Sequence, residues 1–109
     1  KVLLERGADI DKARDDGATP LFMASHEGHV ELVKVLLEGG ADIDKAADDG
    51  ATPLLMASQE GHVEVVKVLL ERGADITRAD NDGLTPRSGA TVPEIIEMLD
   101  LAAQTHHTA

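Results

Sequence analysis

The sequence predicts an all-α solenoid, a one-dimensional stack of short helix pairs, and three observations predict it. A block of residues recurs with a shift of 33 positions. Each copy carries turn and cap residues that fit two short helices. The 109 residues include a single aromatic one, Phe22. Compact cores usually contain several aromatic side chains, which bury about 150–250 Å² each, so a core of small aliphatic residues favours thin, closely packed layers.

The repetition is the strongest of these signals. Residues 17–46 align with residues 50–79, and 24 of the 30 aligned positions are identical. The same shift places residues 2–10 on residues 35–43, and a further copy starts at Asp82. We therefore predict one domain that contains a partial repeat (1–13), two full repeats (14–46 and 47–79), a shortened last repeat (80–103) and a tail (104–109).

Each full repeat opens with a turn and a first helix. Asp-Gly pairs end at Gly17 and Gly50 and mark turns, because glycine adopts positive φ without a steric penalty. The Thr19-Pro20 pair and its copy 33 residues later then start a helix of about two turns. Threonine caps a helix N-terminus, and proline fits the first helical position. We expect Gly28 to end this helix.

A second helix runs from about Val30 to Glu38 and recurs 33 residues later, with its apolar residues on one face. Gly40 and Gly73 suit the position just after a helix end. Helices this short are marginal in isolation, since nucleation is unfavourable. Each repeat is therefore expected to be stable only by packing on its neighbours.

The last repeat departs from this pattern. Aligning residues 63–69 with residues 93–99 needs a shift of 30, three fewer than elsewhere. The deletion falls where residues 87–90 replace residues 54–57, so we expect a stunted or missing first helix. Thr91 and Pro93 still provide a start for the final helix. A shortened, polar last unit is typical of the end of a solenoid, and we predict a C-terminal cap.

These motifs resemble the ankyrin repeat. Thr-Pro-Leu, Gly-His, Val-Leu-Leu and Gly-Ala-Asp occur in its order and spacing from Val2 to about Leu99. The resemblance implies an ankyrin-repeat α-solenoid: a curved stack of antiparallel helix pairs with projecting β-hairpin-like loops and a concave face. One departure is that Phe22 and Leu55 stand where the family usually carries histidine after Thr-Pro-Leu. The hydrogen-bond network of that histidine with the threonine is therefore absent or rebuilt.

Composition narrows the function. The chain has no cysteine, which excludes disulfides, thiolate zinc sites and thiol nucleophiles. The net charge of -11 disfavours binding to nucleic acid, where lysine and arginine displace counterions, and to anionic membranes. The apolar runs are far shorter than the roughly 20 residues that span a bilayer. A protein with a basic surface is the partner we expect.

We predict no catalysis, cofactor or metal. Ser25 and Ser58 lack a third group that would orient a base, and the repeat duplicates every candidate, so no unique constellation exists. His29 and His62 lie one layer apart, too far to share a zinc ion, and we expect a structural role between helices. Residues 42–50 do not follow the pattern of a calcium-binding loop.

The resemblance implies that partners contact the loop tips and the exposed edge of the first helices. The predicted partner-binding residues of the tips are Asp15, Asp16, Ala18, Asp48, Asp49, Ala51, Asn81, Asp82 and Leu84. Those of the first helices are Phe22, Ser25, His26, Glu27, Leu55, Ser58, Gln59 and Glu60. A purely structural role in the turn also fits the aspartates at 16, 49 and 82, because aspartate is favoured before glycine. Packing against the next repeat also fits Phe22 and Leu55.

The sequence thus predicts a non-catalytic protein–protein interaction module. We expect it to be monomeric, intracellular and cytoplasmic, and to be one piece of a longer protein. Two alternatives remain: a structural spacer within a larger multidomain protein, and an engineered or consensus-like binding scaffold, which the near-identical repeats suggest.

Overall fold

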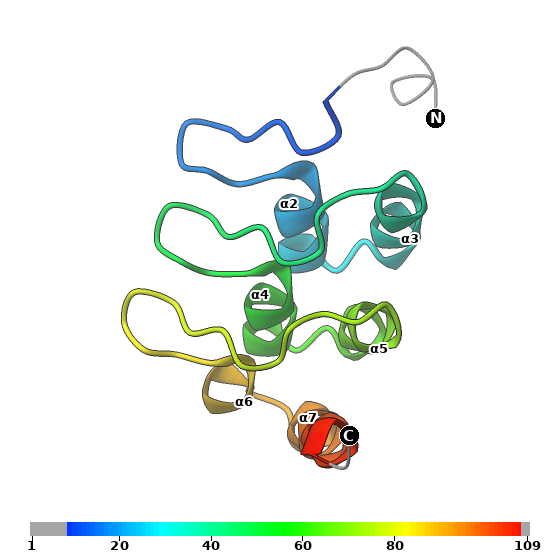
Figure 1. Cartoon of the computed structure of the whole chain (residues 1–109), viewed down its shortest axis with the longest axis vertical. Helices are drawn as coiled ribbons and strands as arrows, with labels where there is room; N and C mark the ends of the chain where they lie inside the picture. Colours follow the sequence, from blue (N-terminus) through cyan, green and yellow to red (C-terminus); the bar gives the residue numbers. More distant parts are fainter. Residues whose placement is uncertain (1–8, 108–109) are drawn as a thin grey trace.

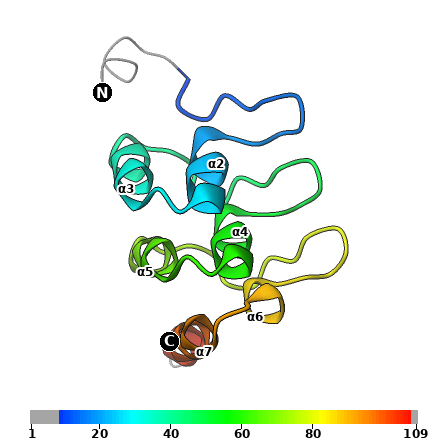
Figure 2. The ribbon, with the colours of Figure 1, turned by 180° about the vertical axis from the view of Figure 1, so that it is seen from behind.

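The computed structural model describes residues 9–107, with side chains described for residues 9–104. Three layers of two helices each are stacked along the longest axis, and three loops project to one side (Figure 1). The layers are α2 (Pro20–Glu27) with α3 (Val30–Glu38), α4 (Pro53–Glu60) with α5 (Val63–Glu71), and α6 (Pro86–Gly89) with α7 (Pro93–His107). The view from behind shows the same order (Figure 2). The predicted α-solenoid is confirmed, whereas most of the predicted partial repeat, residues 1–8, lies outside the described residues.

The first helices begin and end where their cap residues predict. The hydroxyl oxygens of Thr19 and Thr52 accept hydrogen bonds from the backbone N–H groups of Phe22 and Leu55, at 3.1 and 3.2 Å. Both helices have proline in their first turn. Both end at a glycine with φ of 78°, a region that residues with a Cβ rarely adopt. Threonine therefore caps these helices although the histidine usual in the family is missing.

The second helices differ in where they end. After α3 and α5, Gly40 and Gly73 have φ of 96° and 87°, and each turn is closed by a hydrogen bond from the following alanine N–H to a leucine carbonyl, at 3.0 Å. Ala103 stands at the aligned place in α7. Without a glycine there, α7 continues through His107, four residues past the predicted end of the last repeat.

The last layer has the stunted first helix that the three-residue deletion predicts. Helix α6 has only four residues, and its N-terminus is capped reciprocally by Thr85 and Ser88. The Arg87 guanidinium then bonds Asp100 on α7, with Nε and Oδ1 2.6 Å apart. Asp100 aligns with Leu70 of the preceding repeat, so a polar pair replaces a leucine at this end of the stack.

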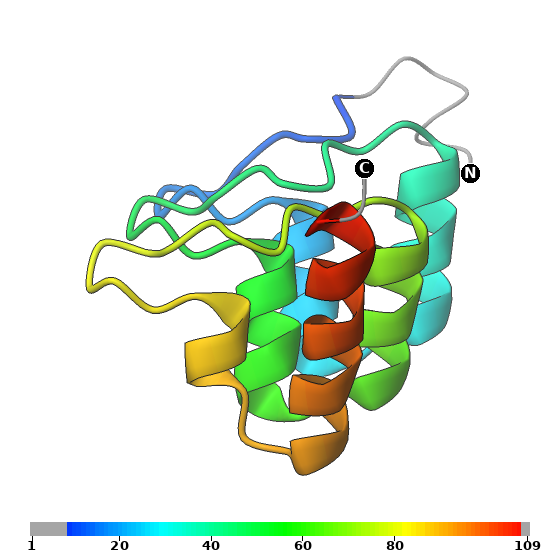
Figure 3. The same ribbon diagram turned by 60° about the horizontal axis from the view of Figure 1, so that its bottom comes forward.

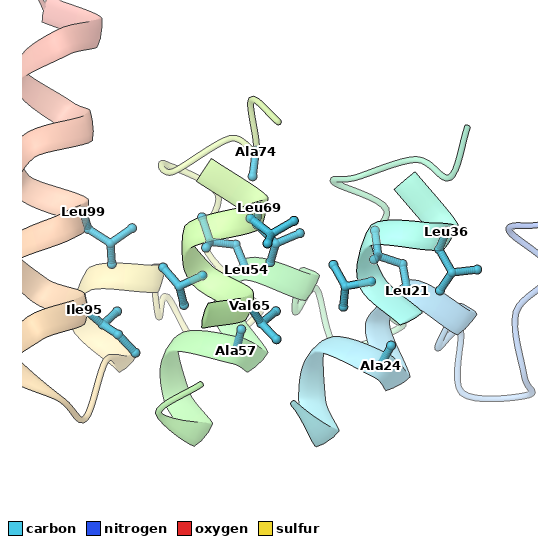
Figure 4. Packing of buried hydrophobic residues seen from close by; sticks show 13 residues of the cluster. Leu21, Ala24, Leu36, Leu54, Ala57, Val65, Leu69, Ala74, Ile95 and Leu99 are labelled. Atoms are coloured by element: carbon cyan, nitrogen blue, oxygen red, sulfur yellow. The ribbon is translucent and has the colours of Figure 1, made fainter. Parts of the chain in front are cut away.

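The core is a single aliphatic strip that runs through all three layers. Leu21, Leu54, Leu69 and Ile95 are fully buried along it, with small residues such as Ala57 between them (Figure 4). Alanine and valine let neighbouring helices approach closely, and leucine and isoleucine fill the space between layers. The described part of the molecule measures 40 × 26 × 25 Å, an elongated shape that needs no aromatic core.

Candidate protein-binding surface

The three projecting loops share one design. Each tip turns at a glycine with positive φ, between 83° and 87°. Below the tip, a backbone N–H donates to the carbonyl four residues later, which closes the loop as a hairpin (Figure 3). The donor and acceptor residues are Arg14 and Ala18 at 3.0 Å, Ala47 and Ala51 at 2.9 Å, and Asp80 and Leu84 at 2.8 Å.

Neighbouring tips are bonded to each other. The Asp48 N–H donates to the Asp16 carbonyl at 3.0 Å, and the Asn81 N–H donates to the Asp49 carbonyl at 2.8 Å. The approach is so close that a Cβ on Gly17 would lie 2.5 Å from an Asp48 carboxylate oxygen. The tips therefore form one continuous edge with a fixed spacing.

Two of the tip aspartates hold their own turns. Asp16 Oδ1 accepts the Ala18 N–H and Asp49 Oδ1 accepts the Ala51 N–H, both at 3.0 Å. In the third loop this role belongs to Asp80, whose carboxylate accepts the N–H groups of residues 82 and 84 at 2.9 Å, and not to Asp82. Asp80 was not among the predicted residues, because the two full repeats carry Arg14 and Ala47 at the aligned position. An aspartate that lies two residues before a turn N–H often accepts its hydrogen bond, and this preference could have identified Asp80.

The tips also differ in charge. In the first loop the Arg14 guanidinium bonds Asp16, with Nη2 and Oδ2 2.6 Å apart. That bond, together with the Ala18 N–H, holds the pKa of Asp16 below its ordinary value. The second and third loops have Ala47 and Asp80 in place of the arginine. Negative charge is therefore most concentrated at the second and third tips.

The first helices contribute a mixed polar and apolar surface beside the loops. Phe22, His26 and Gln59 are half-buried, and Glu27 and Glu60 are exposed. His26 Nε2 on α2 lies 3.8 Å from a Glu60 carboxylate oxygen on α4. Side chains of adjacent layers thus meet on this surface.

The structure corrects the prediction for five residues. Ala18, Ser25, Ala51, Leu55 and Ser58 are at most 2% exposed and are not accessible to a partner. The alanines lie at the base of the hairpins. The serines share a buried helix face with the leucines four residues earlier. The leucine meets α6, where a Cβ on Gly89 would lie 2.9 Å from its Cδ1 atom, so the alternative of packing against the next repeat is confirmed for it.

Twelve of the predicted residues remain at least partly accessible, and their contact with a partner stays a prediction. They lie on the loop edge and on the adjoining helices α2 and α4. They are Asp15, Asp16, Phe22, His26, Glu27, Asp48, Asp49, Gln59, Glu60, Asn81, Asp82 and Leu84.

The two repeat histidines have different partners. His62 Nε2 lies 3.0 Å from the His26 carbonyl of the layer before, which confirms its structural role. In the last layer the Thr91 hydroxyl donates to the Gln59 carbonyl at 3.1 Å in the same way. His29 instead lies 3.2 Å from a Glu27 carboxylate oxygen. Among the side chains of residues 9–104, no three of His, Asp or Glu converge as metal ligands would. No helix within residues 9–107 has the length and apolar character to cross a bilayer.

A family model described as ankyrin repeats (3 copies) matches residues 1–80. The chain belongs to the ankyrin repeat family. Ankyrin repeats are protein–protein interaction modules, and the family is generally non-enzymatic. The match ends before α6, so the last ankyrin layer, with its deletion and its extended final helix, lies outside the matched part. Comparison with curated protein sequences gives no match.

Proposed function

We propose that this ankyrin array is a non-catalytic module that binds a protein with a basic surface through its loop edge and the exposed concave face of the first helices α2 and α4. The observation that carries the proposal is the row of exposed aspartates on tips that are bonded to one another. Asp15, Asp48, Asp49 and Asp82 are exposed on this edge. The half-buried side chains of Phe22 and Leu84 add apolar surface beside the carboxylates.

The bonds between tips support binding because they fix the edge before a partner arrives. A surface that is already ordered loses little conformational entropy on association, so more of the contact energy appears as affinity. The carboxylates add long-range attraction, which accelerates the encounter with a basic surface. We also propose that the array is a monomer, since copies that each carry a net charge of -11 repel one another. The cytoplasm is the location that we propose for it.

The test begins with a pulldown using the array and a variant whose exposed tip aspartates are replaced by alanine. The association rate of a captured partner is then measured with the double variant Asp15→Lys, Asp48→Lys. We expect this rate to fall about tenfold at low ionic strength and to lose most of its salt dependence, because steering changes on-rates more than affinity.

The matched control is the double variant Glu31→Lys, Glu97→Lys, which makes the same change in net charge on α3 and α7, away from the loops. Its association rate should stay close to that of the unchanged protein. Equal on-rates for the tip variant and the control would overturn the role of the loop edge. If the alanine variant captures the same proteins as the unchanged array, the loop edge is not the surface that binds them. If neither captures any protein, the structural spacer becomes the better description.

A further inference from the structure

A second surface lies on the side of the stack away from the loops, between the outer helices α5 and α7. It is an open groove whose apolar floor includes Val63, Leu70 and Met98. Glu64, Glu71 and Glu94 also line it, and Lys67 is the single cation among the lining residues. This surface shares no residue with the loop edge.

Leu101 makes this groove unlike the rest of the array. With the shift of 30 that aligns the last repeat, Leu101 stands where the two full repeats carry Glu38 and Glu71. Its side chain is 58% exposed, and only Leu32 joins it as an exposed large hydrophobic residue in the described part of the chain. A leucine this exposed buries little apolar surface against the described residues, and in place of glutamate it adds apolar surface to the groove.

Ala102 stands at the position where the preceding interface has the cation Arg72. Between α3 and α5, Arg72 Nη2 lies 3.9 Å from a Glu38 carboxylate oxygen and bridges the two layers. The aligned pair between α5 and α7 is Glu71 and Ala102. Among the side chains of residues 9–104, no salt bridge joins Glu71 to another residue. The groove therefore has more apolar surface than the preceding interface. It keeps the carboxylate of Glu71 but has no arginine at the position that aligns with Arg72.

We propose that this groove binds a cationic segment of a partner protein. A lysine or arginine of the segment would lie opposite Glu71, where the preceding interface has Arg72, and an apolar side chain would pack on Leu101 and Met98. The acidic lining residues and the net charge of -11 disfavour a second copy of this chain as the occupant. The proposal is independent of the loop edge, and the two surfaces together would let one array hold two partners.

The probe for the test is a synthetic amphipathic helical peptide with one lysine face and one leucine face. The chain contains three methionines, Met23, Met56 and Met98, which serve as methyl NMR reporters. Met98 lines the groove, whereas the other two lie on α2 and α4. We expect the peptide to shift the Met98 signal at concentrations that leave the other two unchanged.

Two substitutions restore what the full repeats carry at the aligned positions. Leu101→Glu removes the apolar anchor, and Ala102→Arg supplies Glu71 with an internal cation. Each substitution should raise the Kd of the peptide roughly tenfold or more. The first removes the burial of a leucine side chain and the second removes the peptide's charge pair with Glu71, and each of these interactions contributes about that factor. The matched control is Leu32→Glu, the same change at the other exposed leucine, which should leave Kd within about twofold.

Circular-dichroism melting checks that every variant is folded. The proposal is overturned if Leu101→Glu and Leu32→Glu weaken binding equally, or if the peptide shifts Met23 and Met56 before Met98. It is also overturned if a peptide with serine in place of leucine binds as tightly, since that result shows charge attraction alone. Sedimentation that reveals a dimer abolished by Leu101→Glu assigns the groove to a second copy instead.

Discussion

The two full repeats have nearly the same sequence but differ in how deeply their residues are buried. Val65 is 1% exposed, whereas the aligned Leu32 is 45% exposed. Ala74 and Pro53 are buried, whereas Ala41 and Pro20 are half-buried. The α4–α5 layer lies between two helical layers, and the α2–α3 layer has a described helical layer on one side only. In a stack, the neighbours of a residue decide how much it contributes to stability.

The same comparison explains one of the few sequence differences between the repeats. The Asp44 carboxylate accepts the Asp75 N–H of the next layer at 2.9 Å, as Asp11 does for Asp42 at 3.0 Å. Thr77 is the next residue in this series, and it bonds Asp75 within its own loop, at 2.7 Å. After the last repeat, helix α7 continues where another loop would begin. A carboxylate at position 77 would therefore find no loop N–H group of a following layer to bind.

The largest expected effect comes from a pair of glycine substitutions. Together they distinguish the cost of backbone strain from the cost of a steric clash with the neighbouring layer. Gly28 and Gly40 both have positive φ, but a Cβ on Gly28 would lie 2.7 Å from the His62 ring, and a Cβ on Gly40 would meet no atom within 4 Å. We expect Gly28→Ala to lower the free energy of unfolding by about 3 kcal/mol and Gly40→Ala by about 1 kcal/mol, the usual penalty of the left-handed region. Urea denaturation of both variants measures the difference, and equal values would show that the layer contact carries no cost.

The second prediction reverses the order that side-chain size alone suggests. Val65→Ala should cost about 2 kcal/mol of unfolding free energy, because it leaves a cavity between layers. Leu32→Ala removes more atoms but from a largely exposed side chain, so its cost should stay within about 0.5 kcal/mol. Denaturant midpoints at constant slope provide the measurement. A larger loss for Leu32→Ala would mean that burial in the first full repeat is much greater than its exposure indicates.

The third prediction uses the two histidines of the Gly-His motif. His62→Ala should cost about 1.5 kcal/mol, since it removes the hydrogen bond to the His26 carbonyl and the packing beneath Gly28. His29→Ala should cost less than about 0.5 kcal/mol, because among the described residues its ring pairs only with the exposed Glu27 carboxylate. Combining His62→Ala with Gly28→Ala should destabilise less than the sum of the two, since the clash is then gone. Additive free energies of unfolding would contradict this contact.

The local elements of this fold were predictable because single residues determine them. Thr19-Pro20 starts a helix, Gly28 ends it, and the three-residue deletion shortens α6 to one turn. These effects depend on backbone geometry close in sequence. The extension of α7 beyond residue 103 belongs to the same class, and the replacement of a stop glycine by Ala103 was the available signal.

The accessible part of the candidate surface was less predictable because it depends on the register between layers. Leu55 and Phe22 occupy the same place in the repeat, yet only Leu55 is fully buried, since the neighbouring α6 approaches it with a glycine. Ser58 has the polarity of a surface residue but faces the core. The Arg14–Asp16 ion pair, which changes the charge of the first tip, depends on how the side chains are oriented in the loop.

The smallest expected effect compares two exposed ion pairs. Arg87 bonds Asp100 across thirteen residues and joins α6 to α7, whereas Arg14 bonds Asp16 within one loop. The arginine in each pair holds the pKa of its aspartate below the ordinary value of 3.8, chiefly through the side-chain hydrogen bond. A lowered pKa in the folded state means that the stabilisation is present above that ordinary value and is lost as the pH falls through the lowered pKa.

Replacing the arginine with glutamine should therefore matter at neutral pH and stop mattering in acid. We expect Arg87→Gln to lower Tm slightly at pH 6 and the gap to the unchanged protein to close below pH 3.8. Arg14→Gln should lower Tm less, because Asp16 keeps its bond from the Ala18 N–H and the pair does not join two helices. Thermal melts across this pH range measure both gaps. A gap for Arg87→Gln that persists unchanged in acid would mean that the arginine stem, and not its charge, joins the last helix to the stack.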